Sequence, residues 1–342
     1  MTGCARTHSN GVRGIAPPFS TIYYLPSNIS QNDCTAYLKN VRKGQDENGG
    51  SDLAKYLIVN ADDFGLCRAS NEAVETLFQN GRLHSSTIMM PARAAKEAVQ
   101  FAVDHPEYAV GVHLTLTSEW PKYRWKPLTG GQSLVDETGN MWPTSKLVER
   151  NAKYSEVEAE LRAQVDAAHA LGMHPSHLDN HMGSLYGHHG GRLSFSKLAL
   201  RVCGDYGYAY RYFTSTDKRL CPRGVPYPVY RLFALLPRHW SRRYGVILPD
   251  YLIFPDWTAD LRTSYAHYRE TILRIWTDIP DGVTETFVHP CVESDEIKSF
   301  IGAWRNRVWE YDLLNDPETH RYLADHGVQM ISFRELVQMK RK

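Results

Sequence analysis

The sequence predicts an α/β fold in which parallel strands alternate with helices. The first observation is an apolar run, Tyr56 to Val59, that ends in polar residues and a glycine, as a buried strand does. The second is that short apolar runs and amphipathic stretches alternate after it, which is typical of βαβ units. The third is the length of 342 residues, because an α/β barrel commonly uses about 250 residues as one domain.

The chain divides into an extension and one folded domain. Residues 1–54 lack periodicity and are rich in Gly, Ser, Asn and Asp, so we expect a flexible N-terminal extension before a domain at 55–342. The domain is expected to contain strands at 56–59, 84–90, 109–116 and 286–288, and helices from Ser70 to Gly81 and at 92–104, 156–171, 260–277 and 294–314, with another starting at Asp316-Pro317. Two stretches interrupt this order, 118–145 and 218–257, and we interpret them as substrate loops or a lid, the second with a short helix.

Composition excludes several classes of protein. A formal net charge of +1 argues against a nucleic-acid-binding surface. No apolar run approaches the ~20 residues of a membrane span, and we find no signal peptide. The six cysteines form no CxxC pair and indicate reduced thiols, so we expect a cytoplasmic protein. The sequence leaves open whether the chain forms a homodimer.

Two adjacent carboxylates, Asp62 and Asp63, follow the first strand. Successive strand residues point to opposite faces, so both cannot enter one core, but from a loop after the strand they can converge on one site. One can then hold a cation while the other accepts a proton. The alternative is that one of them caps the following helix, although a cap needs only one acid.

Histidines occur at the ends of two later strands. The segment from Val110 to Leu116 alternates strictly and places His113 on the face opposite its apolar residues. His177 and His181 could share a metal only in a helix, because in an extended segment they lie about 13 Å apart. Gly172 and Pro175 indicate that the preceding helix has ended, so we expect the segment from His177 to His181 to be a strand in which only one of the two histidines is a metal ligand.

We favour His181 as that ligand, because it lies nearer the carboxyl end of the strand, with Asp179 as its hydrogen-bonding partner. An acid and two histidines from three separate strands are a usual ligand set for one divalent metal with open positions. The role of His177 stays undefined.

Four segments in order resemble the motifs of the YdjC-like carbohydrate deacetylases: Asn60 to Gly65, Gly111 to Leu114, His177 to His181 and Val288 to Pro290. The resemblance covers roughly residues 55 to 337 and includes the ending from Gly327 to Leu336. It implies a distorted (β/α) barrel of the polysaccharide-deacetylase type, one divalent ion (Mg²⁺ or Zn²⁺) and hydrolysis of an N-acetyl group on a sugar. It further implies Asp62 as general base and Asp63, His113 and His181 as metal ligands. Many members continue the histidine motif as H-x-H-x-H, whereas this chain keeps only the first histidine and continues with Met182 to Leu185.

Other residues are candidates for contact with the substrate. The loop after His113 carries aromatic residues that can stack on sugar rings or form a small core of their own, namely Trp120, Tyr123, Trp125 and Trp142. Arg211 is placed to contact the substrate or Asp62. His289 can protonate the leaving amine or steady the oxyanion, and the alternative is a structural histidine before a proline turn.

We therefore expect a metal-dependent hydrolase that removes an N-acetyl group from a small, neutral amino sugar or oligosaccharide. One alternative is another single-metal hydrolase such as a phosphoesterase, although phosphate chemistry usually uses two metals or clustered cations. A non-catalytic sugar-binding protein is the other alternative, and it would not need Asp62.

Overall fold

A computed structural model describes residues 54–187, 190–212, 214–216, 226–253 and 260–341. The predicted N-terminal extension therefore lies outside the described residues, as does part of the predicted lid at 218–257. The described chain contains one parallel sheet in the order β5-β4-β3-β2-β1-β7-β6, and β8 lies beside the first residues of β1. The strands are β1 (Lys55–Phe64), β2 (Ser85–Ile88), β3 (Ala109–Leu114), β4 (His177–Asn180), β5 (Ala209–Tyr210), β6 (Tyr251–Leu252), β7 (Gly282–Val288) and β8 (Val328–Met330).

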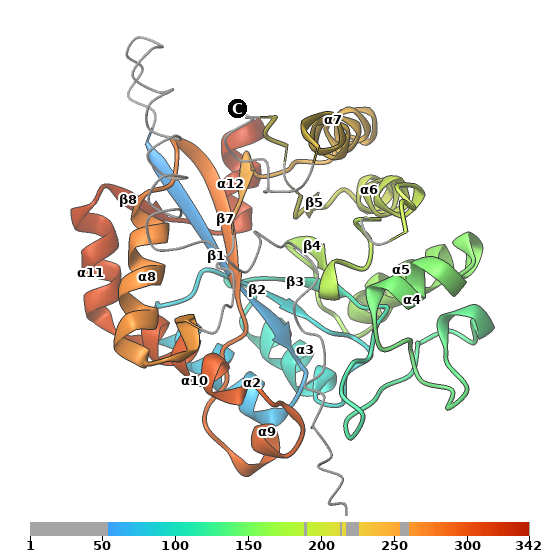
Figure 1. The fold of residues 1–342 in the computed structure, drawn as a ribbon, viewed down its shortest axis with the longest axis horizontal. Helices are drawn as coiled ribbons and strands as arrows, with labels where there is room; N and C mark the ends of the chain where they lie inside the picture. The colour runs from blue at the N-terminus through green and yellow to red at the C-terminus, as the bar shows by residue number, and fades with distance from the viewer. Residues whose placement is uncertain (1–53, 188–189, 213, 217–225, 254–259, 342) are drawn as a thin grey trace, which may run out of the picture.

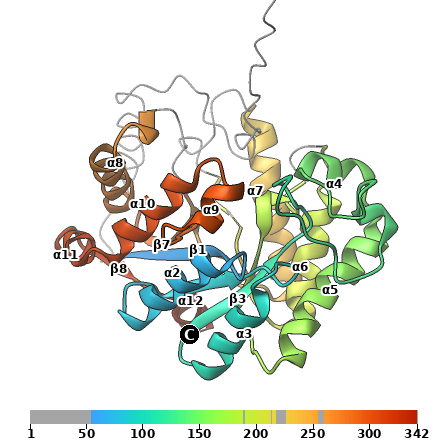
Figure 2. The same cartoon turned by 90° about the horizontal axis from the view of Figure 1, so that it is seen from below.

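Helices surround this curled sheet, with α8 and α11 on one side and α5 and α6 on the other (Figures 1 and 2). They are α2 (Arg68–Gln79), α3 (Ala95–Asp104), α4 (Ser145–Asn151), α5 (Tyr154–Ala170), α6 (Ser194–Tyr206), α7 (Tyr227–Tyr244), α8 (Tyr265–Thr277), α9 (Asp295–Phe300), α10 (Trp304–Asn315), α11 (Pro317–Asp325) and α12 (Phe333–Arg341). Within the described chain β5 and β6 do not pair, so the sheet is an incomplete barrel. The predicted α/β class with a distorted barrel is confirmed.

Several boundaries differ from the expectation. The first strand continues through both aspartates to Phe64, because hydrogen bonding to β2 and β7 extends beyond the apolar run. The predicted short helix in 218–257 is wrong: α7 has 18 residues, with Pro237 inside it. Ser70 is not the N-cap of α2, which is Cys67, although its hydroxyl bonds the backbone of Cys67.

The amino ends of the strands are closed by the C-terminal segment. Phe333 and Leu336 are fully buried against Ile58, Ala209 and Val283, which come from β1, β5 and β7. Because apolar side chains fill the amino end of the barrel, the site is built at the carboxyl ends of the strands.

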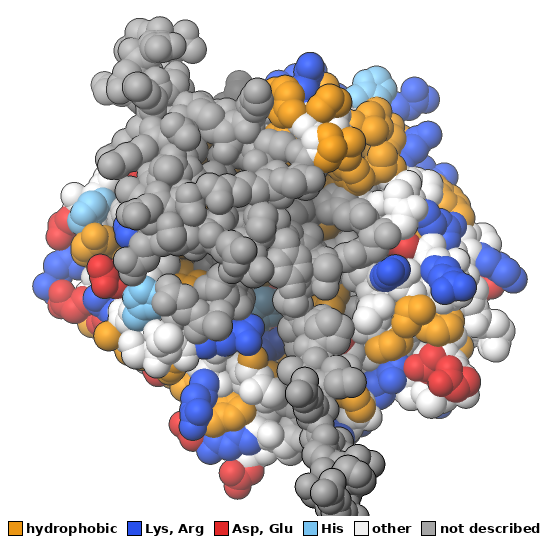
Figure 3. Space-filling model, viewed as in Figure 1, with side chains coloured by type: hydrophobic (Ala, Val, Ile, Leu, Met, Phe, Trp, Pro, Cys, Tyr) orange, Lys and Arg blue, Asp and Glu red, His pale blue; other side chains and the backbone are white. Residues whose placement is uncertain are grey.

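One helix exposes apolar side chains. Val229, Leu232 and Leu235 on α7 are each about two-fifths exposed, and Figure 3 shows apolar side chains gathered over this helix. None of the described helices combines the length and the apolar character that a membrane span requires.

Candidate metal centre

The last residues of β1 bring both aspartates to one place. Asp63 has a φ of 62°, in the left-handed region, and the register of β1 against β2 shifts between Ala61 and Phe64. This irregularity turns the Asp63 side chain away from strict alternation. As a result Asp62 Oδ2 lies 3.8 Å and Asp63 Oδ1 3.5 Å from the same atom, His113 Nε2. The expected convergence thus occurs within the strand rather than in a loop after it, and Cys67, not either aspartate, caps α2.

His113 is fixed by Asp179 of the neighbouring strand. The two residues are paired in the register of β3 and β4, and His113 Nδ1 lies 2.7 Å from Asp179 Oδ1. An Nδ1–H that donates to this carboxylate leaves the lone pair of Nε2 facing the aspartates. Gly111 allows this close approach of β3 to β4, because a Cβ on it would collide with the carbonyl oxygen of His177.

His181 begins a 3-10 turn directly after β4 and is buried. Its Nε2 lies 3.0 and 3.1 Å from the two carboxylate oxygens of Glu119, and its Nδ1 lies 3.2 Å from Asp63 Oδ1. The expectation that Asp179 supports His181 is wrong. Asp179 lies within β4, two residues before His181, and contacts His113 of the adjacent strand instead, whereas Glu119 contacts His181.

Asp63, His113 and His181 can hold one metal ion together. Asp63 Oδ1 is buried and has no hydrogen-bond partner within the described chain, which is costly unless a ligand satisfies it. Atoms bound 2.0–2.2 Å from a tetrahedral ion lie about 3.4 Å apart, and the distances of 3.2 and 3.5 Å from this oxygen to the two histidine nitrogens match. Each histidine also has its other nitrogen tied to a carboxylate, as metal-binding histidines do. The donor set therefore fits a divalent ion.

A second group, Asp62, His113 and Asp179, is less suited to a metal because a guanidinium already fills it. Arg211 donates to both oxygens of Asp62 at 2.6 and 2.7 Å, lies 2.9 Å from Asp179 Oδ2 and donates to Glu285 Oε1 at 2.6 Å. Burial raises the pKa of Asp62, but Arg211 outweighs that effect and lowers the pKa to about 2. Asp62 is thus an ionised carboxylate in a fixed orientation.

Negative charge exceeds positive charge around these residues. Burial lowers the pKa of His181, but the carboxylates of Glu119 and Asp63 outweigh it and raise the pKa to about 10. Burial also raises the pKa of Glu285 to about 8, even though Arg211 acts in the opposite direction. With Glu285 protonated and His181 charged near neutral pH, the negative groups of the described cluster are Asp62, Asp63, Glu119 and Asp179, and its positive groups are Arg211, Arg307 and His181. A divalent cation would offset this imbalance.

His289 follows β7, one residue beyond the paired Ala61 and Val288, and so lies beside the end of β1. Its side chain is 26% exposed, and Nδ1 lies 3.9 Å from Glu310 Oε2. Burial lowers the pKa of His289, but the Glu310 carboxylate raises it above its ordinary value overall. His289 is not in either metal-ligand group found within the described chain.

His177 is separate from the metal ligands. It is fully buried, stacks on Phe333 at 3.7 Å between ring centroids, and its Nε2 lies 3.1 Å from Asn60 Oδ1. Burial holds its pKa well below the ordinary value. His177 therefore belongs to the packing at the amino end of the barrel.

The aromatic residues of 118–145 lie in a small core of their own. Trp120, Tyr123 and Trp125 are each less than a tenth exposed and pack in one apolar cluster. The Tyr123 ring stacks on Phe300 at 4.1 Å, and its hydroxyl donates to the carbonyl of Leu66. The ring centroid of Trp125 lies 6.1 Å from that of His181.

Trp142, the fourth aromatic residue of this loop, is only partly buried and donates from Nε1 to the carbonyl of Ser133. Sequence reasoning could not separate the small core from a sugar platform, because both use aromatic side chains.

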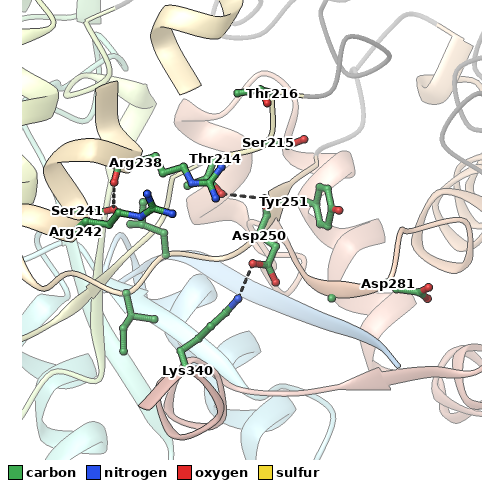
Figure 4. Close-up of a pocket in the computed structure, with 13 residues that line it drawn as sticks. Thr214, Ser215, Thr216, Arg238, Ser241, Arg242, Asp250, Tyr251, Asp281 and Lys340 are labelled. Carbon is green, nitrogen blue, oxygen red and sulfur yellow. Dashed lines mark hydrogen bonds and ion pairs between the residues drawn. The ribbon is translucent and has the colours of Figure 1, made fainter. Parts of the chain in front are cut away.

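A cavity of about 1120 Å³ lies elsewhere in the molecule, lined by parts of α7, β6 and α12. Figure 4 shows Arg238 and Arg242 on one side of it and the ion pair of Lys340 with Asp250, at 2.5 Å, on the other. None of the predicted site residues lines it.

Sequence analysis missed three residues of the site, Glu119, Glu285 and Arg307. Glu285 lies on the same face of β7 as Val283 and Phe287, so an acid among apolar residues was a usable signal. Glu119 and Arg307 carried no comparable signal, because a glutamate in a loop and an arginine on a helix are usually exposed.

Comparison with known proteins identifies the family of the chain. Residues 56–325 match the family model described as YdjC-like protein. A carbohydrate deacetylase of Geobacillus stearothermophilus is 30% identical over 84% of this chain and 100% of its own length, and one of Thermus thermophilus is 31% identical over 82% of this chain and 94% of its own.

A solved structure from Enterococcus faecalis, a candidate cellobiose-phosphate cleavage protein, aligns with a TM-score of 0.65 and 24% identity over 83% of this chain and 99% of its own, and it supports the fold. The chain thus belongs to the YdjC-like protein family.

Proposed function

We propose that this protein is a metal-dependent hydrolase that removes the N-acetyl group from a small amino sugar or oligosaccharide. The observation that carries the proposal is the buried Oδ1 of Asp63, which lies 3.5 Å from one nitrogen of His113 and 3.2 Å from one nitrogen of His181, the spacing expected around one tetrahedral ion. Relatives named carbohydrate deacetylase, and a chitooligosaccharide deacetylase of Yersinia enterocolitica that is 36% identical over 132 residues, support the class of substrate.

A divalent ion such as Zn²⁺ or Mg²⁺, held by Asp63, His113 and His181, would supply an activated water and polarise the acetyl carbonyl. The protein's own contribution is to hold those three side chains in register. Asp179 orients His113, and Glu119 orients His181, so neither ring can turn its lone pair away.

Asp62 is proposed as the base that takes the proton of the attacking water. It lies beside the ligands without belonging to the favoured set, and the fork of Arg211 keeps it ionised and oriented. Arg211 itself is 2% exposed, and its described partners are carboxylates, which supports a positioning role for it over direct contact with the substrate.

His289 is proposed as the acid that protonates the leaving amine. Its raised pKa favours the protonated form near neutral pH, and its partial exposure leaves it accessible to a substrate. Among the aromatic residues, the partly buried Trp142 is proposed to meet a sugar ring because it lies outside the small core. Trp125 is the second candidate, because its ring lies near that of His181, although it packs in the small core with Trp120 and Tyr123.

The test is acetate release from a panel of N-acetylated sugars by protein reconstituted with zinc or magnesium, with phosphate esters assayed in parallel. We expect acetate release that chelation abolishes and metal restores. Faster hydrolysis of the phosphate esters would favour the phosphoesterase alternative. Sugar binding without turnover by the metal-loaded protein would favour the binding protein.

A further inference from the structure

Arg307 reaches the proposed metal ligands from α10. Its Nη2 donates to Asp63 Oδ2 at 2.8 Å, across 244 residues of sequence. The guanidinium carbon lies 5.5 Å from the centre of the Trp120 ring, and the backbone carbonyl accepts from Cys291 N at 3.1 Å. The side chain is only 12% exposed. A helix, an aromatic ring and a carboxylate therefore fix the position of this guanidinium.

The contact divides the two oxygens of Asp63 between two tasks. Oδ2 is held by Arg307, whereas Oδ1 faces His113 and His181 and has no hydrogen-bond partner within the described chain. Oδ1 is therefore the oxygen that remains to face a cation.

The second terminal nitrogen of Arg307, Nη1, takes no part in the contact with Asp63. Nη1 is buried and makes no hydrogen bond within the described chain. An unpaired buried donor on a charged group is costly, so native proteins usually satisfy such groups. Arg211, the other buried guanidinium of the cluster, has carboxylate contacts at Nε and at both terminal nitrogens. The contrast indicates that the acceptor for Nη1 is supplied by a ligand.

We propose that Arg307 is a substrate-binding residue that holds Asp63 with Nη2 and binds an oxygen of the substrate's acetyl group with Nη1. This rests on the proposed function, because it assigns the donor to the part of the substrate that all N-acetylated sugars share. The two nitrogens belong to one planar group, so an oxygen bound to Nη1 lies next to Asp63. A fixed cationic donor there also gains strength as negative charge develops on the carbonyl oxygen. Arg307 would then select the acyl group, leaving the sugar to other contacts.

The test compares the zinc-loaded wild type with Arg307→Met and Arg307→Lys. Acetate, the acyl product, is the probe, and its affinity is measured by calorimetry. Zinc content is measured by elemental analysis, and kcat and KM are measured with the best N-acetylated sugar. Arg93→Met is the matched control, since Arg93 also lies over a ring of the aromatic cluster, 4.1 Å from the centre of Tyr123, but is exposed.

We expect zinc content to stay near one per chain in every variant. Acetate affinity should fall about 10- to 100-fold in Arg307→Met, by the size of a hydrogen bond to a charged group, and less in Arg307→Lys. Arg93→Met should bind acetate like the wild type.

Unchanged acetate affinity in Arg307→Met, or no acetate binding by the wild type, would overturn the proposal. Loss of zinc from Arg307→Met would also overturn it, because the role of Arg307 would then be only to hold Asp63. If instead acetate binding depends on Arg307 while no N-acetylated sugar is hydrolysed, the proposed function fails and this binding role stands.

Discussion

Replacing Glu285 by glutamine should make the stability of this protein less dependent on pH. Glu285 is fully buried on β7, and three carboxylates, those of Asp62, Asp179 and Glu285, share the single guanidinium of Arg211. Burial and the neighbouring carboxylates raise the pKa of Glu285 from 4.5 to about 8, against the pull of Arg211. Glutamine has the shape of the protonated side chain and cannot ionise.

The sign follows from proton binding in the two states. In the unfolded chain Glu285 loses its proton near pH 4.5, whereas in the folded protein it keeps the proton until about pH 8. Below pH 4.5 both states are protonated, so the native state carries no penalty. Between these values the wild type loses about 1.4 kcal/mol of stability for each pH unit, because the unfolded state binds fewer protons. The free energy of unfolding of Glu285→Gln minus that of the wild type should therefore grow by about 3.5 kcal/mol from pH 5 to pH 8, slightly less than the full slope gives, because both pKa values lie near the ends of this range.

The assay is urea unfolding of both proteins at pH 5, 6, 7 and 8 in the presence of a chelator, so that no bound cation perturbs the cluster. Titrating groups far from Glu285 are common to both proteins and cancel in the difference, and Asp62, which shares Arg211 with Glu285, stays ionised over this range because its pKa is about 2. A difference that stays constant with pH, or that shrinks as pH rises, would refute the assignment of a proton to Glu285 at neutral pH.

Three further predictions concern the metal and its surroundings. Glu119→Ala should weaken zinc binding about 10- to 100-fold, because it frees the His181 ring, whereas Glu137→Ala, which removes an exposed acid of the same loop, should leave zinc binding unchanged. Zinc affinity is measured by chelator competition, and equal affinities of Glu119→Ala and the wild type would reject the role of Glu119. Asp62→Asn should keep the metal and lose most turnover, whereas Asp63→Asn should lose the metal itself, and near wild-type turnover by Asp62→Asn would exclude it as the base. His177→Ala should leave zinc content unchanged but lower the free energy of unfolding by about 2–4 kcal/mol, because it leaves a cavity beside Phe333. Loss of zinc from this variant would show that His177 is a metal ligand.

The chemistry at the strand ends could be predicted because it depends on local order. Apolar runs alternating with amphipathic helices determine a parallel sheet, and the carboxyl ends of parallel strands meet at one edge. Residues at the carboxyl ends of those strands, such as Asp63, His113 and His181, are therefore brought to the same edge of the sheet. The ordered motifs also carried the resemblance to the family, which the comparisons confirmed.

The tertiary structure decided how each of these groups is held. Only the shift in register at the end of β1 shows that both aspartates face His113, and only the pairing of β3 with β4 gives Asp179 to that histidine rather than to His181. Glu119 and Arg307 come from a loop and a helix whose sequences look like ordinary surface segments. Hydrogen bonds to buried charges depend on distances of a few tenths of an ångström between segments far apart in the chain, and sequence periodicity contains no information about such distances.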